Sequence, residues 1–544
     1  MKLKAISAAL LAALMFTACA PPAAPTDSTP AGSPSSTTAQ PAGEKVVTMA
    51  ISSTWETLMP FNTSSNYGDV IFDQLYDRLV FNRGDNTFEP RLASGWEVGE
   101  DAKSITFAID PNAKWHDGQP VTAEDVAFTA QLVSDPAINS SKRSFLNYFE
   151  GVDDSGAELS ADSIGVEVLE GNKVRFNLKR PMDPEIILGV FNKNFFVLPK
   201  HILEDKTVEE VNGPDLWEAP IGSGPFKFGN SIAGEEIQLD CNESYHLGKP
   251  DFDKLVIRVT QSANLVAGLM SGDIDILAGS GLAAIPLEDW ETAQAQENLN
   301  CVSIENYSYQ YMVYNTQREY MTAEVRRAID MAINRSTIVD QLLKGEGQIL
   351  ATPWGPNHPY CNKEVYPPEY DPETAKQMLA DAGWDTGREL LMMVPTGNKV
   401  RERSAVLIQQ DLEKVGVKIK LQSVDFPTLM SSMQNGETDF GLVGASPAAD
   451  PDDHKPALEP GSSTNFSLLT DPTLYELMKK GLEATSFEAR KAIYDEEQVK
   501  FREICNLSML YSPNTLFAYN KRIQNVQPTD SNFLNWATWE WKVD

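Results

Sequence analysis

Two stretches of the sequence, residues 264–279 and 428–444, share one local pattern that strongly limits the fold. They read NLVAGLMSGDIDILAG and TLMSSMQNGETDFGLVG. In each, apolar residues at helical spacing end at a glycine, Gly272 or Gly436, as a left-handed helix cap requires. Asp275 or Asp439 then precedes a short apolar run typical of a buried strand. The pattern predicts two α/β lobes built alike with a cleft between them; a chance match of a common helix-to-strand turn is the alternative.

The stretch at residues 92–129, LASGWEVGEDAKSITFAIDPNAKWHDGQPVTAEDVAFT, contains a His116–Asp117 pair that could suggest catalysis. The alternating segment SITFAI predicts a half-buried strand, and Asp117–Gly118 predicts a turn. Thr122 suits a helix N-cap, with acidic residues following in the first turn. No second catalytic group is spaced to serve His116. We therefore interpret this stretch as scaffold.

The first residues, MKLKAISAALLAALMFTAC, form a short basic region followed by an apolar run. That run is too short for a mature membrane-spanning helix, and residues 1–18 are therefore expected to be a secretion signal. Small residues precede Cys19 in a pattern that resembles a bacterial lipobox, which implies cleavage before Cys19 and lipid on its thiol. An ordinary signal peptide with a chance cysteine is the alternative. Residues 19–44, rich in Pro, Ala, Ser and Thr, are expected to form a disordered tether.

The chain carries 45 basic and 77 acidic side chains, a formal charge of −32. Such a body is repelled by nucleic acid and by anionic lipid headgroups. Four cysteines follow Cys19: Cys241, Cys301, Cys361 and Cys505. No pair of them has zinc-ligand spacing. Disulfide pairs and free buried thiols both stay open.

Several enzyme signatures are missing from the sequence. No GxxxxGK[ST], GxSxG or HExxH motif occurs, and the five histidines are scattered. A glycosidase needs only two carboxylates, so a secreted hydrolase stays as a minor alternative. The sequence predicts no cofactor and no metal.

Beyond residue 45 the chain resembles the family 5 extracellular solute-binding proteins, the receptors of peptide/nickel-type ABC importers. The resemblance is carried, in the family's order, by the 92–129 stretch and by PIGSGPFKF, VRRAIDMAINRSTIV, PETAKQMLADAGW, DLEKVGVKIKLQ, GETDFGLVG and MLYSPNTLFAYNKRIQNVQ. These strings cover most of residues 45–530. None of them is specific for one ligand.

The resemblance implies an α/β, periplasmic-binding-protein-like two-lobe fold with a hinged ligand cleft. Lobe I is expected at 45–305 plus 508–544, with an extra subdomain at about 81–200, and lobe II at 306–507. The chain is expected to be a monomeric receptor rather than an enzyme, lipid-anchored outside the cytoplasm of a bacterium, that delivers a peptide or peptide-like solute to an ABC permease. A signalling or adhesion role is a further alternative.

Aromatic side chains are the expected walls of the cleft. Alternation places Tyr307, Tyr309 and Tyr311 on one face of an extended segment beside the presumed hinge, although packing beneath the sheet is the alternative. Trp55 and Trp354 are further candidates. Ser446 and Asp450 are the polar candidates.

The segment GLVGASPAADPDDHKPAL departs from the pattern of peptide receptors in this family. The resemblance implies an aspartate near Pro447 that pairs with the free amine of a peptide, and this chain has none there. Asp450, Asp452 or Asp453 is expected to substitute, or the ligand is a metal chelate, an oligosaccharide or a modified peptide. DPDDH also has residue types that bind metals, but a solvated turn is the favoured interpretation.

Overall fold

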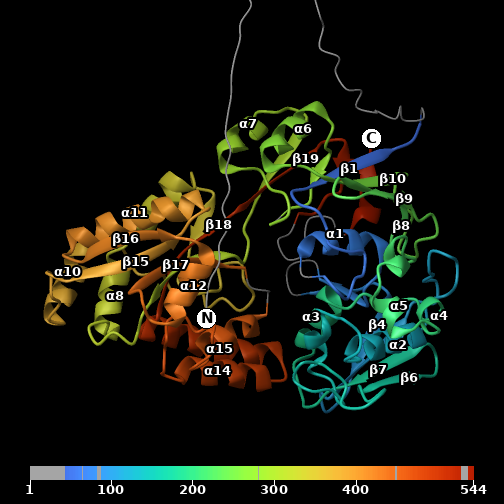
Figure 1. Cartoon of the computed structure of the whole chain (residues 1–544), viewed down its shortest axis with the longest axis horizontal. Helices are drawn as coiled ribbons and strands as arrows, with labels where there is room; N and C mark the ends of the chain where they lie inside the picture. Colours follow the sequence, from blue (N-terminus) through green and yellow to red (C-terminus); the bar gives the residue numbers. More distant parts are fainter. Residues whose placement is uncertain (1–42, 64, 83–86, 280, 447–449, 529–536) are drawn as a thin grey trace, which may run out of the picture. The chain divides into compact units, whose positions relative to one another are not determined.

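The computed structural model describes residues 43–63, 65–82, 87–279, 281–446, 450–528 and 537–544. The predicted signal peptide, the lipidation site Cys19 and nearly all of the tether lie outside these ranges, as does Pro447. Residues 45–544 form one unit by internal contacts. Two large mixed sheets organise this unit, and each is flanked by helices (Figure 1).

The first sheet has seven strands in the order β12-β19-β11-β1-β10-β9-β8. We refer to the body built on this sheet as lobe I. Its strands and helices are β1 (Val46–Ile51), β8 (Phe226–Ile232), β9 (Glu236–Cys241), β10 (Lys254–Val259), β11 (Ile276–Leu277), β12 (Leu299–Ile304), β19 (Thr515–Asn520), α1 (Asn66–Leu75), α6 (Leu265–Ser271) and α7 (Trp290–Gln294).

The second sheet has six strands in the order β14-β18-β13-β17-β15-β16, and the body built on it is lobe II. Its strands are β13 (Tyr309–Tyr314), β14 (Gly347–Ile349), β15 (Glu389–Pro395), β16 (Lys418–Val424), β17 (Phe440–Ala445) and β18 (Leu507–Pro513). Its helices are α8 (Ala323–Met331), α9 (Arg335–Thr337), α10 (Pro372–Asp381), α11 (Lys399–Lys414), α12 (Phe426–Gln434), α13 (Lys455–Leu458), α14 (Thr473–Glu483) and α15 (Phe487–Ile504).

The chain passes between the two sheets at two places that lie against each other. One passage joins β12 to β13, and the other joins β18 to β19 at Asn514. The Asn306 amide nitrogen in the first passage donates to Pro513 O at 2.8 Å and to Thr515 Oγ1 at 3.0 Å in the second. Since β18 pairs with β13 and β14, the chain leaves the second sheet after residue 513, whereas the sequence placed this boundary at 508.

The two sheets contain the same helix-to-strand unit, as the sequence repeat predicts. Gly272 follows α6 with φ 82°, and Gly436 follows α12 by two residues with φ 67°. In lobe I, Asp275 receives a hydrogen bond from Thr48 N and donates its own amide to Thr48 O, both at 2.8 Å. In lobe II, Asp439 makes the same pair of bonds with Leu391, at 2.7 and 3.1 Å. Each aspartate thus ties its short strand to the parallel neighbour.

A smaller four-stranded sheet, ordered β4-β5-β7-β6, forms an additional layer of lobe I. It is accompanied by a two-stranded ribbon and four helices: β2 (Val80–Asn82), β3 (Phe88–Pro90), β4 (Ala93–Val98), β5 (Ser104–Ile109), β6 (Val166–Leu169), β7 (Lys173–Asn177), α2 (Ala123–Ser134), α3 (Pro184–Lys193), α4 (Lys200–Leu203) and α5 (Val208–Asn212). Two terminal strands, β20 (Ile523–Gln524) and β21 (Lys542–Val543), pair with each other.

The scaffold interpretation of the 92–129 stretch is supported by its local contacts. Thr122 caps α2, and its backbone N–H and hydroxyl both donate to Asp125 Oδ2, at 2.8 and 2.9 Å. His116 lies between two backbone groups: Gly222 N donates to its Nδ1 at 3.1 Å, and its Nε2 lies 3.1 Å from Gly224 O. Burial lowers the pKa of His116 to about 4. The ring therefore fastens two segments together in its neutral form.

The hydrophobic cores divide with the sheets. One large cluster joins lobe I to its additional layer, and the two faces of the second sheet carry separate clusters. Along β13 the side chains alternate between them: Met312 and Tyr314 enter one cluster, while Tyr309 and Val313 enter the other. This period of two is what an extended strand requires. In Figure 1, α11 lies along the strands β15 to β17 of this sheet.

Candidate functional site

The tyrosines of the segment before and within β13 are packed at different depths. Tyr309 is only 2% exposed, and its hydroxyl lies 3.2 Å from His454 Nδ1. Tyr311 is half-buried and packs against the same cluster, with its ring centroid 5.4 Å from that of Tyr309. Tyr307 is half-buried, with its ring 4.8 Å from that of His358. Tyr309 and Tyr311 therefore share a face, and Tyr311 and Tyr307 retain exposed area.

The two tryptophan candidates lie in different lobes. Trp354 is 3% exposed and belongs to the same lobe II cluster as Tyr309; its ring lies 5.8 Å from that of Tyr494. Trp55 is half-buried against the core of lobe I, in the loop after β1. Trp354 therefore supports the tyrosine face from within, whereas Trp55 has exposed surface of its own.

Ser446 is exposed just after β17, and Asp450 begins the short turn Pro451–His454. Asp450 accepts a hydrogen bond from Asp452 N at 2.9 Å. Both of its carboxylate oxygens also lie against Arg490 Nη2, at 2.8 and 3.0 Å. The carboxylate that the sequence offers as a substitute amine anchor is therefore already paired with a cation.

Arg490, in α15, is the residue that the sequence analysis missed. Its side chain is 1% exposed. Besides Asp450 it reaches the hydroxyl of Tyr360, 2.9 Å from Nη1, and its guanidinium carbon lies 5.2 and 5.5 Å from the ring centroids of Tyr360 and Tyr494. A buried arginine that is paired and stacked in this way is held rigidly. Its one sequence signal is weak: a charged side chain that lies four residues before the aromatic Tyr494 in α15.

The guanidinium of Arg490 also faces lobe I. Asp183, the N-cap of α3, places its Oδ2 3.9 Å from Arg490 Nη1. Close by, Arg180 Nη1 donates to Leu482 O in lobe II at 2.8 Å. Burial and the carboxylate of Asp183 raise the pKa of Glu185, in the first turn of α3, to about 7. The start of α3 and the helix pair α14–α15 thus form a charged contact between the lobes.

The DPDDH turn does not present its side chains as a group. His454 is buried with Nδ1 against Tyr309, and burial lowers its pKa to about 4. Asp452 lies 3.4 Å from Lys455. Across the described ranges, no group of three or more His, Cys, Asp or Glu side chains is arranged to hold a metal ion. The same residues include four free cysteines and no disulfide: Cys241, Cys301, Cys361 and Cys505.

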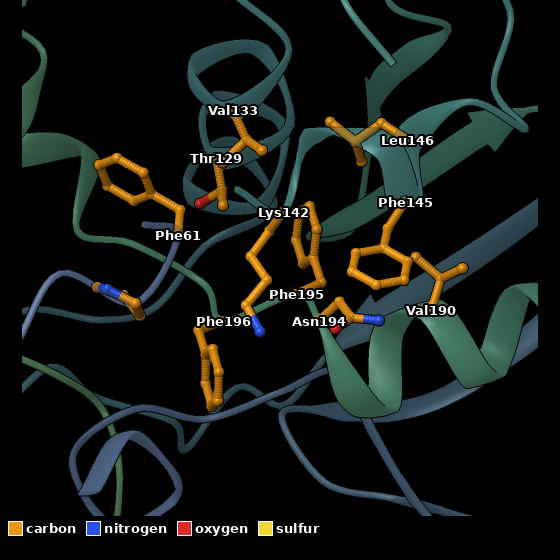
Figure 2. Close-up of a pocket in the computed structure, with 11 residues that line it drawn as sticks. Phe61, Thr129, Val133, Lys142, Phe145, Leu146, Val190, Asn194, Phe195 and Phe196 are labelled. Atoms are coloured by element: carbon orange, nitrogen blue, oxygen red, sulfur yellow. The ribbon is translucent and has the colours of Figure 1, made fainter. Parts of the chain in front are cut away.

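A small pocket lies in the additional layer of lobe I (Figure 2). Phenylalanine side chains line it, and Lys142 extends across it toward Asp69, with 3.6 Å between Nζ and Oδ2. Its free volume is about 10 Å³, close to the minimum that holds one water molecule. None of the candidate residues lines this pocket, which is too small for a solute.

Among the residues that the structure describes, no helix is both long and apolar enough to cross a bilayer.

The comparisons with known proteins identify the family. The model of the bacterial extracellular solute-binding proteins, family 5, matches residues 87–467. The chain is 30% identical to the oligopeptide-binding protein AppA of Bacillus subtilis over 449 residues, which cover 77% of each protein. The chain belongs to this family. It is a solute-binding receptor that acts outside the cytoplasm, not an enzyme.

The chain is also similar to a second curated protein and to a solved structure. Heme-binding protein A of Haemophilus influenzae is 27% identical over 446 residues, covering 78% of this chain and 79% of the relative. The solved structure of the ABC transporter substrate-binding protein CtaP of Listeria monocytogenes superposes with a TM-score of 0.80 at 24% identity, covering 92% of this chain and 99% of the other. The family 5 two-lobe fold is therefore shared.

Proposed function

We propose that this family 5 receptor captures a peptide or peptide-like solute and delivers it to the permease of an ABC importer. The observation that carries the proposal is the 30% identity to an oligopeptide-binding protein across three quarters of both chains. A receptor of this kind needs no catalytic group, because it releases the solute unchanged. The protein is expected to work as a monomer, since one chain supplies both lobes.

The proposed ligand position is the space between the two sheets beside the paired passages of the chain. Tyr307 and Tyr311 offer partly exposed aromatic area on the lobe II side, and Trp55 offers it on the lobe I side. Tyr309 and Trp354 are buried directly behind the lobe II face and would fix its shape. Ser446, exposed at the end of β17, is the proposed polar partner of a peptide backbone. Aromatic walls with few polar anchors suit peptides of varied sequence.

A free peptide amine presents the main question of specificity. Its ammonium would be costly to bury without a carboxylate partner, and Asp450 is the nearest substitute in sequence for the aspartate that the family pattern implies. Asp450 is paired with Arg490, so an incoming amine must compete with that guanidinium. This pairing is also the observation that favours the second candidate, a solute without a free amine, such as a metal chelate or an oligosaccharide.

Calorimetry with matched peptides separates these ligand classes. Soluble Ala–Ser peptides of graded length are titrated in free and N-acetylated forms. If Asp450 reads the amine, acetylation abolishes binding, and Asp450→Asn weakens binding of the free form alone. Equal binding of both forms would show that the amine is not read. Absence of binding by every peptide would contradict the peptide assignment and direct the titration to metal chelates and oligosaccharides.

We further propose that residues 1–18 are removed as a signal peptide, that Cys19 carries lipid, and that residues 19–44 tether the receptor to the membrane. The lipobox-like residues before Cys19 support this. The expected result of Cys19→Ala is release of the protein from the membrane fraction into the medium or periplasm. Cys241→Ala, in the folded body, serves as the control and leaves the protein anchored. Retention of the Cys19→Ala variant on membranes would contradict lipid anchoring.

The proposed domain division follows the two passages of the chain. Lobe I comprises about 45–305 and the segment from the second passage to 544, with the additional layer at about 81–200. Lobe II comprises the residues between the passages. The sheet memberships of β12, β13, β18 and β19 support this division.

A further inference from the structure

The contact between α3 and α15 contains more carboxyl groups than cationic groups. Asp183 and Glu185 lie on the lobe I side, and Asp450 and Glu488 lie on the lobe II side, close enough for their charges to act on both lobe I carboxyl groups. The guanidinium of Arg490 acts on the same two groups with the opposite sign. The raised pKa of Glu185 reflects its burial and its proximity to Asp183. A cluster of this composition is stabilised by any further positive charge that reaches it.

Only one of the two carboxylate oxygens of Asp183 accepts a hydrogen bond from a described residue. One oxygen accepts the Glu185 N–H at 3.1 Å, which caps α3. The other, Oδ2, accepts no hydrogen bond from any described residue, although Asp183 is only 1% exposed. Arg490 Nη1 is 3.9 Å away, and Arg490 Nε has no acceptor within the part of the chain that the structure describes. A buried carboxylate oxygen without a donor is costly, so a small approach of the two groups is favourable.

Arg490 therefore has two carboxylate partners at unequal distances. Asp450, in its own lobe, is in hydrogen-bond contact, whereas Asp183, in the opposite lobe, lies just beyond hydrogen-bond range. When Asp450 is fully charged, it holds the guanidinium toward lobe II. If a cation pairs with Asp450, its positive charge cancels most of the attraction that Asp450 exerts on the guanidinium, and Asp183 becomes the stronger remaining partner.

We propose that Asp183 and Arg490 form a latch between the lobes whose state is set by the charge on Asp450. A solute cation, such as a peptide amine, pairs with Asp450 and releases Arg490 to form a direct hydrogen-bonded ion pair with Asp183. Solute binding in lobe II is thereby converted into attraction between the lobes. The solute-driven step rests on the proposed function, but the exchange of partners by Arg490 does not.

The latch is tested first without any solute, because Asp450→Asn removes the same charge that a bound cation would neutralise. Each protein carries a dye pair at Leu159→Cys and Tyr366→Cys, positions that are 71% and 70% exposed in the two lobes, with Cys241, Cys301 and Cys361 replaced by Ser. Single-molecule energy transfer reports the distance between the lobes. Asp450→Asn is expected to shift the population toward the shorter distance, and adding Asp183→Asn is expected to reverse that shift.

The sequence supplies a matched control for the cap at Asp183. Asp183-Pro184-Glu185 begins α3, and Asp371-Pro372-Glu373 begins α10 in lobe II. Asp371→Asn therefore alters the same kind of helix cap without touching the contact between the lobes. It is expected to leave the Asp450→Asn shift intact. No shift with Asp450→Asn, or a shift that survives Asp183→Asn, would overturn the latch.

A second measurement uses whichever Ala–Ser peptide binds the unmodified protein. Loss of one charge-assisted hydrogen bond corresponds to about a tenfold change in a rate or affinity. Asp183→Asn is expected to release the peptide about tenfold faster, with little change in the association rate. Arg490→Lys keeps the positive charge but lacks the planar set of guanidinium donors, and it is expected to behave similarly. Unchanged release in both variants would overturn the solute-driven step. If no peptide binds the unmodified protein, the proposed function fails, while the solute-free experiment still decides the latch.

Discussion

At the scale of single residues, lobe II contains a carboxylic acid in an unusual setting. Glu497, in α15, is fully buried, and neither of its oxygens has a hydrogen-bond partner among the described residues. Burial raises its pKa to about 8 from the ordinary value of 4.5. The residue is therefore neutral in the folded protein at neutral pH, because a charge there would lose its hydration without gaining a partner.

We predict that this residue makes stability fall as the pH rises. Because the folded-state pKa lies above the unfolded value, the contribution of Glu497 is complete below pH 4.5 and is lost as the pH rises toward about 8. Glu497→Gln removes this dependence. Urea unfolding should show the variant to be more stable than the unmodified protein at pH 8, by a few kcal/mol, and to have lost that advantage at pH 5.

Two features keep this measurement specific. Glu496→Gln changes the exposed neighbouring acid and should give no such pH-dependent difference. Burial lowers the pKa of His454 to about 4, so this residue makes the folded protein less stable as the pH falls below 6.5. His454 is present in all three proteins, and its effect on the differences between them therefore cancels. Equal differences between Glu497→Gln and the unmodified protein at both pH values would contradict a neutral buried Glu497.

At the scale of elements, the duplicated helix-to-strand unit explains how each lobe fixes its central strands. Asp275 accepts from Thr48 N and from two nitrogens of Arg522, at 2.7 and 2.6 Å. Asp439 accepts from Leu391 N and from the Tyr320 hydroxyl at 2.6 Å. The aspartates are 3% and 7% exposed. Each aspartate therefore accepts from a backbone N–H of the neighbouring strand and from at least one polar side chain, at the start of a buried strand.

We predict that Asp275→Ala lowers the free energy of unfolding by about 3 kcal/mol, because it leaves the Thr48 amide and the Arg522 guanidinium without their acceptor. Asp273→Ala, two residues earlier in the same unit and exposed, should cost less than about 0.5 kcal/mol. Urea unfolding of the two variants measures both. Similar losses from the two substitutions would show that the Asp275 bonds do not stabilise the unit.

Local patterns in the sequence predicted these elements because their causes are local. The glycines at 272 and 436, the Thr122 cap and the alternation along β13 depend on residues a few positions apart. The pairing of Arg490 with Asp450 and Asp183 could not be predicted in this way, because it joins residues 40 positions apart and residues on opposite lobes. The burial of Tyr309 and Trp354 could not be predicted from the sequence either, because aromatic residues in a cleft wall and in a core follow the same alternation.

At the scale of the whole molecule, the two passages between the sheets are tied by Asn306, so the lobes share one hinge region. Solute that bridges the lobes should shift the protein toward a closed form. We predict a smaller radius of gyration by small-angle scattering with a saturating solute than without it. An unchanged radius with a solute whose binding is verified by calorimetry would indicate a rigid cleft.

The central claim, that this receptor carries a peptide-like solute, is tested most directly by native mass spectrometry of the protein purified from cells grown in peptide-rich medium. The account predicts a folded population heavier than the chain alone, from which mild unfolding releases compounds that fragment into amino-acid residues. Released compounds that contain metal, porphyrin or sugar and yield no amino-acid fragments would contradict the claim.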